Sequence, residues 1–238
     1  MLTFESMEKI AIASGKGGVG KTSLTFILAS ILRDRGYKVG LLDADIYGPN
    51  LTELLSDKPQ KIKISQDPEN KKLIPFKFSN LVINSISYII DQEKAAIWRG
   101  PVLSKAIKQL YLNTEWGDLD YLLIDMPPGT GDAYLTILND LDIKKACLVA
   151  VDDDFCISDL KRTRSLMSKF KIEVLGIIEN MSENLDSDGE ITESVKIKNE
   201  FDDEILFSLP RLSRKDFYQE LKVLDKLKRY LPKRILQI

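Results

Sequence analysis

The chain has 238 residues, of which 44% are hydrophobic, and its 34 basic and 36 acidic side chains leave a net charge of −2. That length and composition are typical of a globular domain with a substantial core, and the balanced charge gives no reason to expect nucleic-acid binding. No run of about 18 apolar residues could span a membrane, and the N-terminus lacks the pattern of a signal peptide, so we expect a cytoplasmic protein.

Two residue types that dominate many active sites are scarce. The sequence contains no histidine, and its two cysteines, Cys147 and Cys156, are too far apart for a CxxC redox or zinc motif. Chemistry must therefore rely on lysine, aspartate, backbone amides and a metal ion. This inventory suits phosphoryl transfer to water, which depends mainly on positioning and charge stabilisation.

Short apolar runs recur along the chain, separated by amphipathic segments. They are Ile10–Ala13, Val39–Leu42, Tyr121–Ile124, Cys147–Val151 and Val174–Ile178. Such runs are typical of parallel strands covered on both faces. After the first, apolar residues recur at helical spacing from Leu24 to Ile31, and Gly36 stands where that helix should end. The alternation predicts an α/β fold, a doubly wound and mainly parallel sheet with helices on both faces.

One segment departs from this alternation. Residues 56–75 are mostly polar and are broken by Pro59 and Pro68, so we expect an exposed excursion that is too short to be a domain. No internal repeat or low-complexity tract divides the sequence. Residues 1–238 are therefore predicted to form a single domain.

The strongest motif is Gly15–Thr22, which matches G-x-x-x-x-G-K-[ST] between a predicted strand and a predicted helix. Its backbone amides and the helix N-terminus form a nest for the phosphates of ATP or ADP, which predicts the fold of a P-loop NTPase. Lys21 is expected to reach the β- and γ-phosphates, and the Thr22 hydroxyl to ligate Mg²⁺. The predicted nucleotide contacts come from Gly15, Lys16, Gly17, Gly18, Val19, Gly20, Lys21, Thr22 and Ser23.

Three aspartates follow predicted strands. Asp125 ends an apolar run in the Walker B arrangement, where the carboxylate holds Mg²⁺ through a bound water. Asp43 and Asp45 alternate across the end of the second strand, so they are expected to do different work. We assign Asp45 to orienting the attacking water and Asp43 to Mg²⁺ or its supporting shell. The alternative for Asp43 is a loop cap.

Three further residues are predicted to touch the nucleotide. Gly129 lies in a rigid turn after Asp125, and its amide could sense the γ-phosphate. Asn180 follows a strand, and its carboxamide could pair with the adenine edge. Arg211, in Leu209–Arg211, is expected to lie beside it and to offer a backbone contact.

Taken together, the motifs resemble a known family. SGKGGVGKT, LLDADIYGPN, WRGP at Trp98–Pro101, DYLLIDMPPGTGD and GIIENMS are similar to the Mrp/ApbC-type iron–sulfur carrier ATPases, in the MinD/ParA group of deviant Walker A proteins. The resemblance implies a cytoplasmic ATP-binding homodimer that holds a [4Fe–4S] cluster and passes it to client or scaffold proteins. It also implies that Lys16 crosses the dimer interface to the partner's nucleotide; the alternative is a solvated surface lysine.

The cluster ligands are where the sequence departs from the family. Members usually carry a C-P-x-C pair shortly after ENMS, whereas this chain has the cysteine-free stretch 183–190. A cluster requires thiolates, and carboxylates are poor substitutes. Cys147 is predicted to be a buried core residue and Cys156 to be the candidate thiol near the ligand face. We therefore expect that the chain does not carry clusters in the family's way.

The C-terminal segment Arg211–Ile238 is basic and amphipathic. It could bind an anionic membrane, but a final helix packed on the sheet is favoured because Pro232 breaks the pattern. Two functions follow from the sequence: an ATPase of iron–sulfur protein maturation, or an ATP-switched positioning protein of the MinD/ParA kind. A metabolic kinase is disfavoured because no acceptor pocket or lid can be named.

Overall fold

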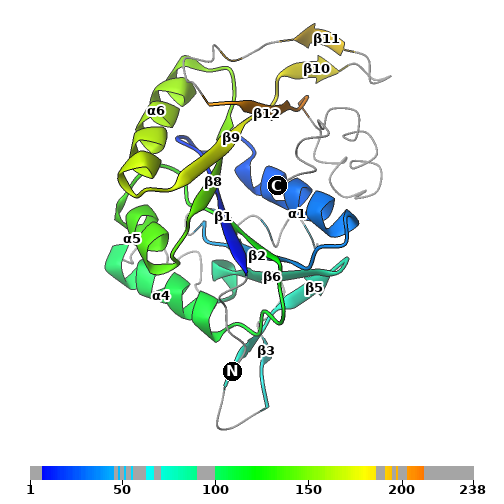
Figure 1. Cartoon of the computed structure of the whole chain (residues 1–238), viewed down its shortest axis with the longest axis vertical. Coiled ribbons are helices and arrows are strands. Elements are labelled where there is room, and N and C mark those ends of the chain that lie inside the picture. The colour runs from blue at the N-terminus through cyan, green and yellow to red at the C-terminus, as the bar shows by residue number, and fades with distance from the viewer. Residues whose placement is uncertain are drawn as a thin grey trace.

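The computed structural model describes residues 7–45, 48, 51, 55, 63–66, 71–89, 100–185, 191–194, 197 and 203–211 (Figure 1). Its main sheet is built from β1 (Glu8–Ala13), β2 (Val39–Asp43), β5 (Phe76–Phe78), β6 (Leu81–Ser85), β7 (Tyr121–Asp125), β8 (Lys145–Ala150), β9 (Glu173–Glu179) and β12 (Ile205–Ser208). Within the described residues the sheet has eight strands in the order β12-β9-β8-β1-β7-β2-β6-β5. Neighbouring strands are parallel except β5, which pairs with β6 in the antiparallel sense.

The five predicted strands are confirmed as β1, β2, β7, β8 and β9, each extended by one or two residues or shifted slightly. They form the centre of the sheet. Helices cover both faces there, so successive residues of each strand are buried and the strands are continuously apolar. Strands β5, β6 and β12 were not predicted. They lie toward the two edges of the sheet, and the edge strands β5 and β12 are short and only partly buried.

Among the residues that the structure describes, four α-helices flank the sheet: α1 (Lys21–Asp34), α4 (Gly100–Asn113), α5 (Asp132–Asp140) and α6 (Asp154–Lys169). Figure 1 shows α4, α5 and α6 along one side of the sheet and α1 on the other. The predicted periodicity is confirmed in α1, where Leu24, Ile27, Leu28 and Ile31 are all buried. The helix ends two residues before Gly36, whose φ of 92° is a left-handed conformation suited to glycine.

Two small ribbons project from the main sheet. Antiparallel β3 (Lys63–Ile64) and β4 (Leu73–Ile74) lie within the polar segment 56–75, and antiparallel β10 (Glu183–Leu185) and β11 (Ile191–Ser194) follow β9. Lys63 and Ile64 are exposed, while most of the segment 56–75 lies outside the described residues, so the exposed excursion stays a prediction. The predicted C-terminal helix falls beyond residue 211, outside the described residues, and the extent of the single domain stays a prediction. No helix in the described part of the chain is long and apolar enough to cross a membrane.

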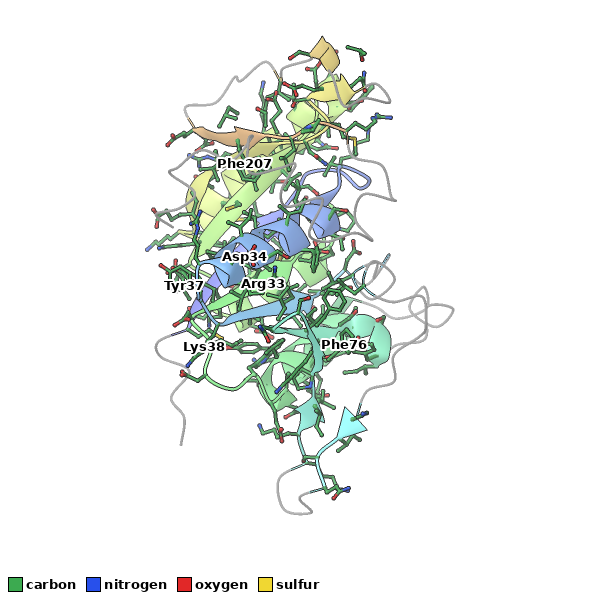
Figure 2. The ribbon with its side chains drawn as sticks, turned by 90° about the vertical axis from the view of Figure 1, so that its right-hand side faces the viewer. Arg33, Asp34, Tyr37, Lys38, Phe76 and Phe207 are labelled. Carbon is green, nitrogen blue, oxygen red and sulfur yellow. The ribbon has the colours of Figure 1, made fainter. Side chains whose placement is uncertain are left out.

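The strand order brings the predicted aspartates together at the carboxyl ends of the central strands. β7 lies between β1 and β2, and Asp125 is in register with Ile12 on one side and Asp43 on the other. The carboxyl ends of these strands therefore meet where α1 begins, the position at which open α/β sheets bind ligands. Figure 2 shows Arg33, Asp34, Tyr37 and Lys38 gathered around the opposite, C-terminal end of α1, with Phe76 and Phe207 on the two edge strands.

Candidate functional site

The loop from Ser14 to Gly20 joins β1 to α1 and packs closely on α6. A Cβ atom at Gly15 would lie 2.4 Å from the carbonyl carbon of Asp159 and 2.6 Å from the nitrogen of Leu160. Only glycine allows the loop to approach the α6 backbone this closely. The Ser14 hydroxyl donates to the carbonyl of Lys16 at 2.9 Å and braces the same turn.

Lys21 opens α1 and points its ammonium group at the carboxylates. Its Nζ lies 2.7 Å from Oδ1 of Asp125 and 3.7 Å from Oδ2 of Asp45, and its side chain is 6% exposed. Burial lowers the pKa of Lys21, but the charges of Asp125 and Asp45 outweigh burial and leave that pKa raised. The structure therefore brings together three residues that the sequence predicted to share a site.

Asp43 is fully buried behind this group. Its Oδ1 accepts a hydrogen bond from the backbone N–H of Asp45 at 3.1 Å, and its Oδ2 accepts one from the Ser85 hydroxyl at 2.9 Å. Burial and the neighbouring Asp125 raise the pKa of Asp43 to about 8. Sequence reasoning missed Ser85, although it ends an apolar strand just as Asp43 and Asp125 do.

One carboxylate oxygen of this group is available as a ligand for a further cation. Asp43, Asp45 and Asp125 are buried around one buried lysine, and Oδ2 of Asp125 is buried without a hydrogen-bond partner. The described residues contain no ready-made cluster of three acidic or cysteine ligands for a metal ion. Mg²⁺ does not need one, because it is usually held by one or two carboxylates together with water and phosphate oxygens. The donor set therefore fits Mg²⁺ bound together with a phosphate, and the half-buried Thr22 lies next to Lys21 in the first turn of α1.

Lys16 lies on the surface of the loop and is engaged with its own chain. Its Nζ is 3.3 Å from Oδ1 of Asp153 and 5.9 Å from the centre of the Phe155 ring. The same Asp153 oxygen accepts the backbone N–H of Cys156 at 2.8 Å and caps α6. That hydrogen bond, helped by Lys16, lowers the pKa of Asp153. Asp153 was not predicted as a site residue, although its place in an acidic run before a helical pattern was a usable signal.

The other predicted nucleotide contacts lie around the same loop. A Cβ atom at Gly17 would be 3.8 Å from Cβ of Pro128, so the turn that carries Gly129 lies beside the loop. Asn180 is 8% exposed, and its Nδ2 donates to the carbonyl of Val19 at 2.8 Å. Arg211 is exposed, and its backbone N–H donates to Glu183 at 2.7 Å. The hydrogen-bond partner of Arg211 is thus the third residue after Asn180.

Neither cysteine presents a thiolate. Cys147 is in the core, as predicted, and burial raises the pKa of its thiol to about 12. Cys156 was expected near the ligand face, but it is buried in the first turn of α6, and burial raises its pKa as well. A metal cluster binds thiolates, so these two side chains do not fit one.

A glycine-rich loop between a central strand and a helix, with a buried lysine facing carboxylates from two neighbouring strands, defines the fold and site of a P-loop NTPase. Residues 5–204 match the ParA family described as NUBPL iron-transfer P-loop NTPase. The chain belongs to this family.

Named relatives agree with this family. The iron-sulfur cluster carrier proteins of Haemophilus influenzae and Escherichia coli K12 are 42% and 43% identical over 75% and 73% of this chain. The chain spans about half the length of these relatives, 48% and 46% respectively.

Solved structures share the fold. A nucleotide-binding protein from Archaeoglobus fulgidus in complex with ADP is 29% identical, with a TM-score of 0.75 over 92% of this chain and 88% of its own. The septum site-determining protein MinD of Pyrococcus horikoshii, complexed with Mg-ADP, has a TM-score of 0.64 over 90% of this chain and 86% of its own. At 23% identity, the likeness to MinD concerns the fold alone.

The crowding of the carboxylates predicts that removing the charge of Asp43 stabilises the ligand-free protein. Asp43→Asn removes a buried negative charge that burial and Asp125 both disfavour, while its amide still accepts from Asp45 and faces Ser85. We expect the ligand-free variant to be more stable by about 1 kcal/mol, which corresponds to a rise in Tm of roughly 2–4 °C. Thermal unfolding at pH 8 without nucleotide or Mg²⁺ measures it. An unchanged or lower Tm would mean that Asp43 is not under electrostatic strain.

Proposed function

We propose that this chain binds ATP with Mg²⁺ at Gly15–Thr22, hydrolyses ATP as a homodimer, and serves the assembly or transfer of iron–sulfur clusters. The observation that carries the proposal is the buried Lys21 ammonium between Asp125 and Asp45 at the mouth of the glycine-rich loop. The family description and the names of the curated relatives support the iron–sulfur assignment.

The phosphate-binding part is assigned to the loop itself. Backbone amides from Gly15 to Ser23 and the N-terminus of α1 bind the phosphates, and Lys21 neutralises the β- and γ-phosphates. Thr22, Asp125 and Asp43 would hold Mg²⁺. When bound, Mg²⁺ supplies positive charge to the phosphate oxygens.

Asp45 is the residue assigned to the attacking water. It is 8% exposed, its Oδ2 faces Lys21 at 3.7 Å, and its Oδ1 accepts the backbone N–H of Gly48 at 3.2 Å. A carboxylate fixed in this way can accept a hydrogen bond from water and turn it toward the γ-phosphate. Gly129 would sense the γ-phosphate, and Arg211 would contribute a backbone contact near the base.

The thiols limit what the chain does with a cluster. Both Cys147 and Cys156 are buried, so neither is placed to give a thiolate to an iron–sulfur cargo. The proposed part of this chain is the nucleotide-dependent step of that process.

The function is tested with Asp45→Asn. Loss of the carboxylate should lower kcat for ATP hydrolysis by about 100-fold or more, while the Kd for ATP changes by less than about three-fold. Calorimetric titration and phosphate release measure the two quantities. Asp152→Asn, which removes an exposed acidic side chain adjacent in sequence to Asp153, is the control and should change neither. A wild-type protein that takes up no ATP or ADP would end the proposal.

Lys16 is proposed to leave Asp153 and reach the partner's nucleotide on dimerisation. Asparagine caps a helix as well as aspartate does, so Asp153→Asn keeps the α6 cap but removes the charge that holds Lys16. An exposed ion pair is worth about 0.2–1 kcal/mol, so the protein concentration for half-maximal ATPase activity should fall by a factor of about 1.4 to 5.

Lys16→Ala and Asp153→Asn are compared to interpret the concentration dependence of the ATPase activity. Lys16→Ala should lose the concentration dependence, because the trans contact is gone. If Asp153→Asn left the half-maximal concentration unchanged while Lys16→Ala abolished activity, the ion pair with Asp153 would not compete with dimerisation.

The buried thiols predict that the purified protein does not hold an iron–sulfur cluster firmly by itself. Purified protein reconstituted anaerobically with iron and sulfide should retain less than one [4Fe–4S] cluster per dimer, and Cys156→Ser should not change the iron content. Iron counting and visible absorbance measure it. A stable cluster that disappears in Cys156→Ser would contradict the buried position of this thiol.

A further inference from the structure

Asn180 occupies an unexpected position for a residue that reads a base. It follows β9, and its backbone N–H donates to the carbonyl of Ala150 at the end of β8 at 2.8 Å. Its side chain crosses to the phosphate loop, where Nδ2 donates to the carbonyl of Val19 at 2.8 Å. Because a carbonyl oxygen only accepts, the nitrogen of the carboxamide must face Val19. One of the two Nδ2 hydrogens of Asn180 is thus committed to the loop.

The carboxamide of Asn180 also lies close to Gly20, the residue after Val19. A Cβ atom at Gly20 would lie 2.3 Å from Nδ2 of Asn180, so any side chain there would push the carboxamide away. Gly20 has a φ of 84° and caps the N-terminus of α1, where its carbonyl accepts the backbone N–H of Leu24 at 3.0 Å. Asn180 and Gly20 therefore fit one another at the point where the loop becomes a helix.

The geometry of the peptide bond links this contact to phosphate binding. In a planar trans peptide the carbonyl and the following N–H point in opposite directions. A hydrogen bond that holds the Val19 carbonyl toward Asn180 also turns the Gly20 N–H away from Asn180, to the other side of the loop. Amides turned inward in this way are what a loop needs to bind an anion.

We propose that Asn180 is a positioning residue of the phosphate cradle: by donating to Val19 it keeps the Gly20 N–H directed at the triphosphate. The inference rests on the proposed phosphate binding at Gly15–Thr22. It replaces adenine recognition as the main role of the Asn180 side chain.

A ligand without a base separates the two roles. Asn180→Ala is titrated with Mg²⁺ and ATP, GTP or tripolyphosphate, at a temperature where circular dichroism shows it folded. The inference predicts that all three Kd values rise by the same factor, about three-fold to ten-fold, and that the ratio of the ATP and GTP values stays unchanged. Ser182→Ala is the matched control, because it loses a buried hydrogen bond of 3.0 Å to Leu209 in the same segment without touching the loop. Its three Kd values should equal those of the wild type.

Each contrary result has a distinct meaning. If Asn180→Ala weakened ATP but left tripolyphosphate unchanged, Asn180 would read the base and the inference would be overturned. If the variant only melted earlier, with all Kd values unchanged, the hydrogen bond would be structural. A wild type that binds ATP but no tripolyphosphate would also overturn the inference, whereas a wild type that binds none of the ligands would overturn the proposed function itself. Asn180→Ser, whose hydroxyl is too short to reach Val19, gives the same test should the alanine variant not fold.

Discussion

The buried ammonium of Lys21 is the interaction on which the site depends. It is held at 2.7 Å from Asp125 and at 3.7 Å from Asp45, with Asp43 behind them, in a place that water scarcely reaches. Removing one partner of such a buried pair leaves an uncompensated charge, at a cost of about 3–5 kcal/mol. The end of β7 and the start of α1 are therefore tied to one another electrostatically. The same arrangement concentrates negative charge, which suits a site that receives a divalent cation together with a phosphate.

The phosphate loop is held by packing on two sides. On one side Gly15 lies directly against the backbone of α6, and on the other the carboxamide of Asn180 fills the space beside Gly20. Both contacts require that the loop residue has no side chain. Gly15 and Gly20 thus serve the neighbouring elements as well as the phosphate, because each of the two lets another part of the chain approach the loop backbone closely.

The outer surface of the site carries the residues that are proposed to link nucleotide binding to dimerisation. Lys16 and Asp153 share an exposed ion pair, and the ring of Phe155 beside them is 77% exposed. An exposed pair of this kind is weak, so it can be exchanged for a contact with a second subunit at small cost. Because Asp153 also caps α6, exchange at Lys16 changes the environment of the helix on which the loop rests.

How much the sequence reveals depends on whether a feature is local. The motif Gly15–Thr22, the helix from Lys21 and the central strands could be predicted, because glycine spacing, helical periodicity and continuous apolar runs are local consequences of covalent geometry and burial. The convergence of Asp43, Asp45 and Asp125 followed from their places at strand ends. The pairing of Lys16 with Asp153, of Asp43 with Ser85 and of Asn180 with Val19 did not, since these partners are 137, 42 and 161 positions apart. Only the order of the strands and the packing of α6 on the loop bring them within hydrogen-bond distance, and a linear pattern carries no record of that order.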